Sequence, residues 1–348
     1  MNVRLLIVTA LSSAVFLWAG PASAERTAAE QQLDAIMAEY WDYVLEESPF
    51  AATQAGIDDY NDRLPSVTAA DRARRLQAEK RFLARTRDID RDDLGTQGLV
   101  NAELFEWVLE DSIDARELGL HRIPFNTFSG FFMAALTMSN GIRMDSVEAY
   151  EDYLSRMREV PRYFGENLDN MREGMNTGFV LPQVVIDGIL PTVEAQLKDD
   201  PEDSSFYDPF REMSDRVNAE DKQRLRAEAR RVIAQQVIPA FAELVEFLGS
   251  EYSASETLGA EQLNGGKDYY AFQIKRYTTI ADTTSQDIHE IGLREVARIK
   301  AEMLQIIEDL EFDGGFDEFA EFLRTDPQFY AETPEQLLKE AAWIAKRI

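Results

Sequence analysis

Apolar residues recur at intervals of three and four along most of this 348-residue chain. This spacing places apolar side chains on one face of an α-helix. Two segments, 179–185 and 271–280, are the best candidates for local strand pairing. We therefore expect a mainly α fold, a large multi-helix array with few or no strands. The first helical run ends at Ser48-Pro49 and contains Leu33, Ile36, Met37, Tyr40, Trp41, Val44 and Leu45.

Four further segments refine this prediction. Residues 71–87 are highly charged and predict a solvated helix. Residues 218–248 predict a long helix that Pro239 kinks. Residues 174–178 include two glycines and predict a turn. The phenylalanine-rich segment 123–140 predicts buried loop or short helix, because polar residues and a glycine interrupt it.

Residues 1–24 have the pattern of a secretory signal peptide. Arg4 supplies the positive charge, Leu5–Ala19 is apolar, and Ala22-Ser23-Ala24 places small residues at the cleavage positions. The apolar run is shorter than the roughly 20 residues that span a bilayer. No cysteine lies near the cleavage site, which argues against a lipid anchor. We expect export to the periplasm and no membrane contact after cleavage, since no later stretch looks apolar enough to span.

Composition excludes several classes of protein. The formal net charge is −28, which argues against nucleic-acid partners and against docking onto anionic lipid. The chain has no cysteine, so disulfides, iron–sulfur clusters and a cysteine nucleophile are excluded. With only two histidines, a zinc site built on two or three imidazoles is nearly excluded as well.

No catalytic or metal-binding motif is complete. A zinc peptidase motif needs a second histidine four residues after the first, but His289-Glu290 is followed by Leu293 at that position. His289 is better read as a helix-start residue, capped by Thr284 or Ser285, and His121 as structural. The acidic turn 311–318 lacks the spacing of a calcium loop and predicts a helix connector. We therefore assign no catalytic and no metal-ligating residue to this chain.

Aromatic residues give the best candidates for substrate contact. Tyr269, Tyr270 and Tyr277 could line a substrate cleft, although aromatic side chains at such spacing more often pack in a core. The two glycines at 265 and 266 allow either close approach of a ligand or a simple turn. A long apolar stripe follows and predicts a core helix; it contains Ile288, Ile291, Val296, Ile299, Met303, Ile306, Ile307 and Leu310.

The succession of motifs from Leu258 to Leu338 is more specific than any single residue. It runs through 263–270, 276–279, 288–299, 322–330 and 333–338. The upstream pieces 48–56 and 171–182 belong to the same pattern. This succession closely resembles the bacterial family called domain of unknown function 885, over nearly all of residues 25–348.

The resemblance implies a largely helical, exported protein related to gluzincin metallopeptidases. The zinc motif expected of that family, H-E-x-x-P-G-H-H, has no match here, so no ligand is carried over. Residues 25–348 then resemble the N-terminal half only, and the chain looks truncated before the zinc motif. We expect no cofactor in this chain and zinc in the intact protein.

Two hypotheses remain open. In the first, the intact protein is a zinc-dependent peptidase, its substrate is a peptide, and this chain supplies the helical wall of the cleft. Its partner is then its own missing C-terminal half, and the chain alone is inactive. In the second, the chain is a non-catalytic periplasmic binding or interaction module, complete as it stands.

Overall fold

The structure is a computed structural model that describes residues 26–347. Within that range it is mainly helical and forms no β-strand, only the isolated bridges Phe125–Gly130 and Pro182–Ser255. The mainly α prediction is confirmed. Strand pairing at 179–185 and 271–280 is wrong, because the first segment makes a single bridge and the second lies largely in helix α12. The predicted signal peptide, residues 1–24, lies outside the described residues.

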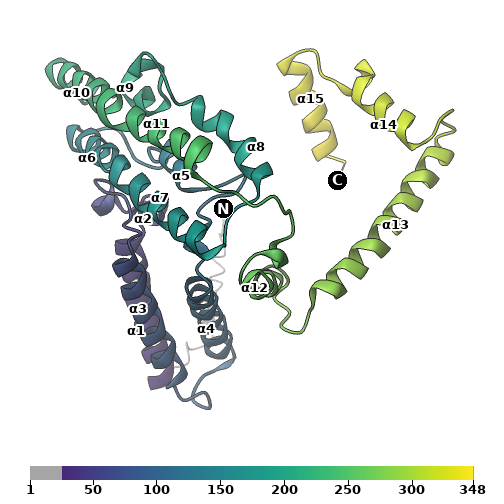
Figure 1. The fold of residues 1–348 in the computed structure, drawn as a ribbon, viewed down its shortest axis with the longest axis horizontal. Helices are drawn as coiled ribbons and strands as arrows, with labels where there is room; N and C mark the ends of the chain where they lie inside the picture. Colours follow the sequence, from purple (N-terminus) through teal and green to yellow (C-terminus); the bar gives the residue numbers. More distant parts are fainter. Residues whose placement is uncertain (1–25, 348) are drawn as a thin grey trace, which may run out of the picture. The chain divides into compact units, whose positions relative to one another are not determined.

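The chain divides into two compact units, which meet in the sequence at Gly266 (Figure 1). The helices of the first unit are α1 (Ala28–Glu47), α2 (Pro49–Gln54), α3 (Ala69–Arg87), α4 (Thr96–Glu117), α5 (Phe131–Leu136), α6 (Val147–Arg158), α7 (Val160–Thr177), α8 (Gln183–Glu194), α9 (Asp208–Arg211), α10 (Ala219–Val232) and α11 (Ile238–Glu246). The helices that follow are α12 (Gly266–Thr278), α13 (Ser285–Asp309), α14 (Phe316–Thr325) and α15 (Pro334–Ala345).

Local sequence signals explain where the first helices begin and end. Thr27 accepts a hydrogen bond from the backbone N–H of Glu30, and the Glu30 carboxylate accepts one from the backbone N–H of Thr27. This reciprocal cap satisfies two N–H groups that have no partner inside helix α1. Helix α1 ends before Pro49, as expected of a residue that precedes proline, and Pro49 opens helix α2.

Helix α3 is less solvated than its charge suggests. Ala78, Phe82 and Leu83 are buried against α1 and α4, and Tyr40 of α1 packs on the ring of Phe82 at 5.2 Å between ring centroids. The prediction of a solvated helix over 71–87 is therefore wrong for one face. A few apolar residues on a helix rich in arginine are enough to bury that face. The charged residues Arg75 and Glu79 are buried with them, each paired with a charge on a neighbouring helix, Glu47 and Arg116 respectively.

The larger core of the first unit lies among α5 to α11. Phe131 packs edge-on against Phe164 at 5.1 Å, and Phe164 packs against Phe241 of α11 at 4.9 Å. Phe125, Phe131 and Phe132 are buried and α5 is short, as predicted for 123–140, but Phe128 in the same segment is 91% exposed. This cluster of interlocked rings fixes the short helix α5 beneath α7.

The long helix over 218–248 is present, but a wide turn accommodates its proline. Residues Ile233–Val237 form a π-helical turn, and the N–H of Ile238 donates to the carbonyl of Ile233. Pro239 has no N–H to donate and its ring crowds the preceding turn, so an added residue in that turn relieves the conflict. The segment Ala219–Glu251 is also long and apolar enough to span a membrane, contrary to our expectation for the region after the signal peptide. Its apolar residues Phe241 and Leu244 are fully buried in the protein core.

Helix α7 passes through the predicted turn at 174–178. It continues to Thr177 and ends at Gly178, whose φ of 73° is left-handed. Gly174 is required for packing instead: a Cβ there would lie 2.7 Å from the carbonyl oxygen of Phe179 and 3.1 Å from that of Arg122. The glycine therefore marks a close approach of three backbone segments, which sequence alone does not distinguish from a turn.

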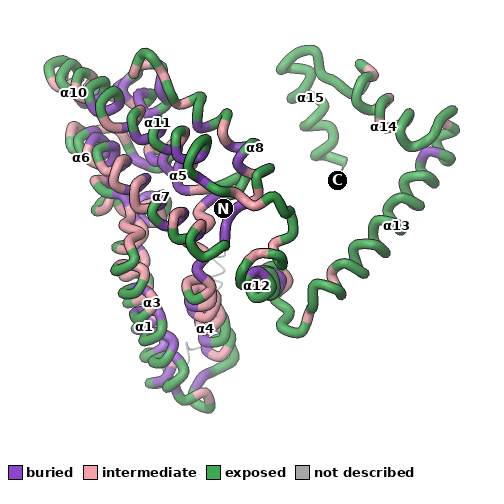
Figure 2. Tube along the Cα trace, viewed as in Figure 1, coloured by how far each residue is buried: buried purple, intermediate pink, exposed green. Residues whose placement is uncertain are grey.

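The second unit has amphipathic helices with little core. Of the predicted stripe on α13, only Ile307 is buried, at 5% exposed, and the prediction that the stripe packs in a core is wrong for the described residues. Figure 2 shows α13, α14 and α15 almost wholly in the colour of exposed residues. A ring cluster of Phe312, Phe319, Phe322 and Phe329 holds α14 to its neighbouring turns. From α13 onward the large exposed apolar residues are Ile291, Leu293, Val296, Ile299, Met303, Leu304, Ile306, Leu310, Phe316, Leu323, Phe329, Tyr330, Leu337, Leu338, Trp343 and Ile344.

Candidate functional site

The three predicted substrate tyrosines all lie on helix α12. Tyr269 is half-buried, and its hydroxyl oxygen accepts a hydrogen bond from the Gln273 side chain at 3.0 Å. Tyr270 is 36% exposed and Tyr277 is 82% exposed. Tyr270 and Tyr277 are seven residues apart and so share one helix face, whereas Tyr269 lies to the side of it. The role of the three tyrosines in a cleft stays a prediction.

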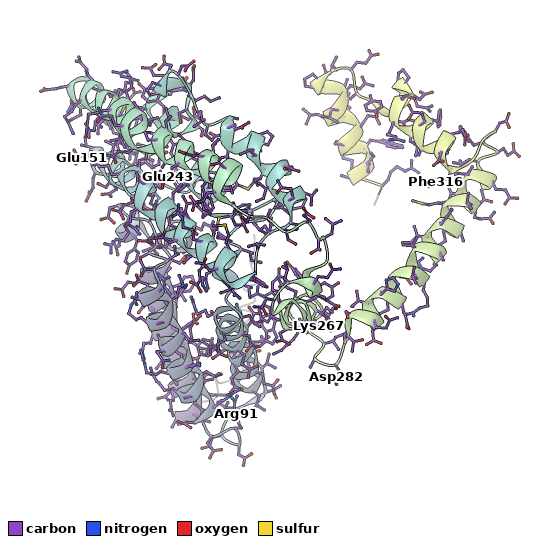
Figure 3. The ribbon with its side chains drawn as sticks, in the orientation of Figure 1. Arg91, Glu151, Glu243, Lys267, Asp282 and Phe316 are labelled. Carbon is purple, nitrogen blue, oxygen red and sulfur yellow. The ribbon has the colours of Figure 1, made fainter. Side chains whose placement is uncertain are left out.

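The glycine pair lies where a turn leads into α12, with Gly265 in the turn and Gly266 as the first residue of the helix. Gly265 has a φ of 76°, and a Cβ on Gly266 would lie 1.7 Å from the carbonyl oxygen of Ala260. No side chain fits there, because the chain folds back on itself at this point. Asn264 donates to the carbonyl of Thr177 at 2.9 Å and ties the turn to the end of α7. Figure 3 shows Lys267 at the start of the helix that follows.

Both histidines have structural surroundings. His289 lies in the second turn of α13, whose N-terminus Thr284 caps, together with Asp287, as predicted. His121 lies 3.1 Å from the carboxylate of Glu173, measured from its Nε2 atom. Burial lowers the pKa of His121, and the charges of Arg72 and Arg122 lower it further, while the hydrogen bond to Glu173 acts in the opposite direction.

These surroundings do not suit zinc. At His121 the positive charges of Arg72 and Arg122 would repel a zinc ion. His289 lies on an exposed helix, and Leu293 occupies the position where a second imidazole would be needed. Among residues 26–347, no group of three or more His, Asp or Glu side chains is placed to hold a metal ion. The described residues thus do not fit a zinc site, and we derive no step through zinc.

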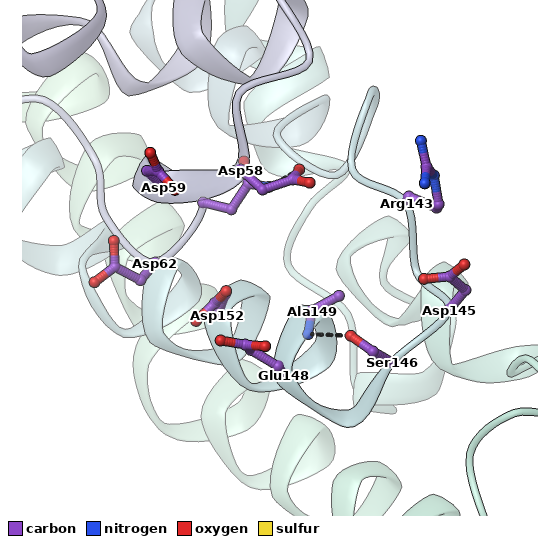
Figure 4. A pocket seen from close by; sticks show the side chains of 10 residues that line it. Asp58, Asp59, Asp62, Arg143, Asp145, Ser146, Glu148, Ala149 and Asp152 are labelled. Carbon is purple, nitrogen blue, oxygen red and sulfur yellow. Dashed lines mark hydrogen bonds between the residues drawn. The ribbon is translucent and has the colours of Figure 1, made fainter.

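A polar cavity lies in the first unit, near the turn after α2 and the start of α6 (Figure 4). It has a volume of about 450 Å³. Ser146 caps helix α6 at its rim by accepting from the N–H of Ala149 at 3.2 Å. Six carboxylates and one guanidinium line it, namely Asp58, Asp59, Asp62, Asp145, Glu148, Asp152 and Arg143.

The charges of this cavity act on one another. Burial raises the pKa of Asp152, and the neighbouring carboxylates of Asp62 and Glu148 raise it further. The buried guanidinium of Arg156 opposes that shift. Sequence reasoning missed the cavity, because in a chain with 64 acidic residues a run of carboxylates has no specificity. The local signals are weak: Glu148 and Asp152 lie one helical turn apart on α6, and Asp58, Asp59 and Asp62 fall within five residues.

Comparison with known proteins gives a family. A family model described as "Bacterial protein of unknown function (DUF885)" matches residues 49–348. The chain belongs to the DUF885 family. The resemblance seen in the sequence is thereby confirmed at the level of the family. A search of curated proteins finds no match.

A solved structure supports the fold of this DUF885 member. The crystal structure of the putative lipoprotein from Colwellia psychrerythraea matches with a TM-score of 0.80 and 18% sequence identity. The match covers 91% of this chain and 58% of that chain. This chain thus spans less than two thirds of the length of that protein, and the likeness concerns the fold alone.

Proposed function

We propose that this DUF885 chain is the helical wall of an exported, zinc-metallopeptidase-like protein that acts on peptides. In this proposal the zinc site and the catalytic base lie in polypeptide outside the chain, and this chain carries neither. The observation that carries the proposal is the row of exposed apolar residues on α13, α14 and α15. Monomeric soluble proteins rarely leave contiguous apolar patches of large size in water, so such faces mark a contact surface.

The length of the structural neighbour supports the same proposal. Of that protein, 42% has no counterpart in this chain, since the match covers 58% of it. A partner polypeptide of that kind, the C-terminal half expected of the intact protein, is our proposed cover for the exposed faces. Export to the periplasm is part of the proposal, and it rests on the signal-peptide pattern at residues 1–24.

The first test uses the purified chain from Glu25 to Ile348. We expect no peptide hydrolysis with or without added zinc, and no zinc retained after dialysis, as measured by elemental analysis. We also expect strong binding of the dye ANS, which reports exposed apolar surface. Zinc-dependent hydrolysis by this chain would contradict our placement of the site. Weak ANS binding together with one cooperative thermal transition would favour the binding module instead.

A substitution pair locates the exposed surface. Replacing Ile299 and Ile306 of α13 together by lysine should reduce ANS fluorescence without lowering the midpoint of thermal unfolding. Val184→Lys, at an exposed apolar residue of α8, is the matched control and should change the fluorescence little. Reading the DNA beyond Ile348 for an open frame that encodes H-E-x-x-P-G-H-H tests the peptidase part of the proposal directly.

The tyrosines of α12 enter the proposal as substrate contacts. Tyr277→Ala should then weaken binding of a fluorescent peptide by the intact protein. Tyr330, which is also exposed and donates its hydroxyl to the carbonyl of Arg324, supplies the matched control Tyr330→Ala. Equal affinity in both variants and the parent would remove the tyrosines from the proposed cleft.

A further inference from the structure

The first unit contains two separate apolar cores. The smaller one lies among α1, α3 and α4, which we call the arm (residues 28–47 and 69–117). The larger one lies in the rest of the unit, which we call the body (residues 49–67 and 120–252). In Figure 1 the arm helices run side by side and extend away from the body. The buried residues of the arm core are Ala29, Leu33, Ile36, Phe82, Leu83, Ile89, Leu94, Ala102, Phe105, Leu109 and Ile113.

The chain crosses between arm and body three times, always at the same end of the arm. The crossings are Ser48 after α1, Thr68 before α3, and Leu118-Gly119 after α4. Gly119 has a left-handed φ of 71°. A rigid bundle whose connections all lie at one end has the layout of a lever, because rotation there stretches no other connection.

Polar side chains join the arm to the body. Helix α7 of the body carries Arg162, Glu166, Asn170 and Glu173, spaced three or four residues apart so that they share one face, and the last two bond to the arm. The opposite face of α7 is buried in the larger core. The Glu166 carboxylate accepts from the N–H of Val67 at 2.7 Å, and Arg162 donates to the carbonyl of Leu64 at 3.1 Å. These bonds fix residues 64–67, the part of the body that leads into α3.

Two neighbouring arm residues bond to the body. The Asp71 carboxylate accepts from the Ser66 hydroxyl at 2.6 Å, and Arg72 reaches further, to helix α7. Its guanidinium donates to the carbonyl of Val67 at 3.0 Å, to the Asn170 side chain, and to the Glu173 carboxylate at 2.8 Å. Glu173 also contacts His121 of the body at 3.1 Å. The Arg72 side chain is 16% exposed and that of Glu173 is 45% exposed, so water reaches this contact.

The third crossing is held from the body side. Arg122 donates to the carbonyls of Leu118 and Gly119 at 2.6 and 2.9 Å, and its guanidinium lies 4.5 Å from the ring centroid of Phe179. These bonds satisfy carbonyls that the end of α4 leaves without a helical partner. The Leu118 carbonyl lies on the arm side of Gly119, so a rotation at Gly119 changes its bond to Arg122, and Arg122 braces this crossing in addition to the Arg72 contacts.

We propose that the arm is a hinged lever that turns against the body about Ser48, Thr68 and Gly119, with Arg72 and its partners on α7 as the latch. The reason is the contrast between the cores and the surface that separates them. Opening that surface exposes polar groups that water can hydrogen-bond, whereas opening either core exposes aromatic and aliphatic side chains. The proposed hinge does not depend on the proposed peptidase role, because none of its residues is assigned to substrate or metal binding.

Paired spin labels test the hinge. The chain has no cysteine, so Ala84→Cys on α3 and Gln223→Cys on α10, both exposed, accept labels at two sites only. Electron–electron distance measurements on the full chain should show one main distance in this parent. Arg72→Gln should raise the ratio of displaced to seated arm about tenfold, roughly the factor that one charged hydrogen bond supplies.

Two further variants make the test decisive. Glu173→Gln removes the same ion pair from the body side and should shift the distances in the same direction, and it decides the matter if Arg72→Gln does not fold. Arg85→Gln removes a two-bond ion pair with Glu39 inside the arm, at 2.9 and 2.7 Å, and should leave the distances unchanged. The hinge is refuted if the folded latch variants keep the parent distribution, or if Arg85→Gln alters it equally.

Discussion

The two units of this DUF885 chain use the same kind of helix in different ways. Leu244 of α11 and Leu310, at the end of α13, both occupy the apolar side of an amphipathic pattern. Leu244 is 0% exposed and Leu310 is 62% exposed. Periodicity therefore predicts that a helix has an apolar face, but not whether anything covers that face. Within the first unit several helices share one core, whereas α13 buries little beyond Ile307.

The largest expected effect compares the same substitution, leucine to alanine, at a covered and at an uncovered apolar face. Leu244→Ala should lower the free energy of unfolding by about 2–5 kcal/mol, because it leaves a cavity in a packed core. Leu310→Ala should change it by less than about 0.5 kcal/mol, because the side chain is largely in water already. Urea unfolding followed by circular dichroism gives both values. A comparable loss in the two variants would mean that α13 has a core of its own.

The next effect concerns buried and exposed charge. Arg156 is fully buried and donates to the carbonyls of Met138 and Tyr60 and to the Thr53 hydroxyl, at 3.1, 2.8 and 3.0 Å. Burial lowers its pKa to about 10. Arg156→Ala should cost about 3 kcal/mol, because buried acceptors lose a charged donor.

An exposed arginine of the second unit is the counterpart. Arg298 of α13 pairs with Glu295 and Glu302 on its own helix at 2.8 and 2.7 Å. Arg298→Ala should cost less than about 0.5 kcal/mol, since solvent screens such pairs. The same urea titration compares the two variants, and a large loss in Arg298→Ala would reveal an interaction that α13 makes elsewhere.

Helix caps give a smaller effect that separates cooperative from local unfolding. Thr27 and Thr284 make similar caps, accepting from the third residue of their helices at 3.1 and 3.2 Å. Each Thr→Ala change should cost about 1 kcal/mol of helix stability. For Thr27 the cost should lower the midpoint of global unfolding, because α1 is packed in the arm core. For Thr284 it should speed amide hydrogen exchange in the first turns of α13 and leave the midpoint in place.

Sequence predicted the helices better than their surroundings, for a physical reason. Caps and prolines are local, so the start of α13 at Thr284 and the break before Pro49 follow from a few residues. The role of Gly174 depends on Phe179 and Arg122, whose backbones approach it only in the folded chain. The sequence also showed no sign of the polar face of α7. Glu166 and Glu173 bond to Val67 and Arg72, which come close to them only in the folded chain. The substrate role of the α12 tyrosines stays a prediction, and the acidic cavity of the first unit was missed.

The smallest effect is acid sensitivity, and it again separates the units. The hydrogen bond from Arg231 is the main cause that lowers the pKa of Glu228 to about 2; burial opposes it, and the hydrogen bond from Arg158 lowers the pKa further. A carboxylate with a lowered folded-state pKa contributes stability above its unfolded pKa of 4.5, and that contribution is lost as pH falls toward 2. Because the group is partly exposed, we expect it to amount to about 1 kcal/mol at most. Glu228→Gln should therefore flatten the stability profile between pH 5 and pH 2.

Asp287 is the matched group in the second unit. Its pKa is lowered by hydrogen bonds from the side chain and backbone of Thr284 at the start of α13. Acid should then weaken the cap of α13, while the midpoint of global unfolding stays where it is because α13 shares so little core. We expect Asp287→Asn to alter the pH dependence of hydrogen exchange in α13 and not the urea midpoint. A shift of that midpoint between pH 5 and pH 3 in Asp287→Asn would show that α13 unfolds together with the first unit.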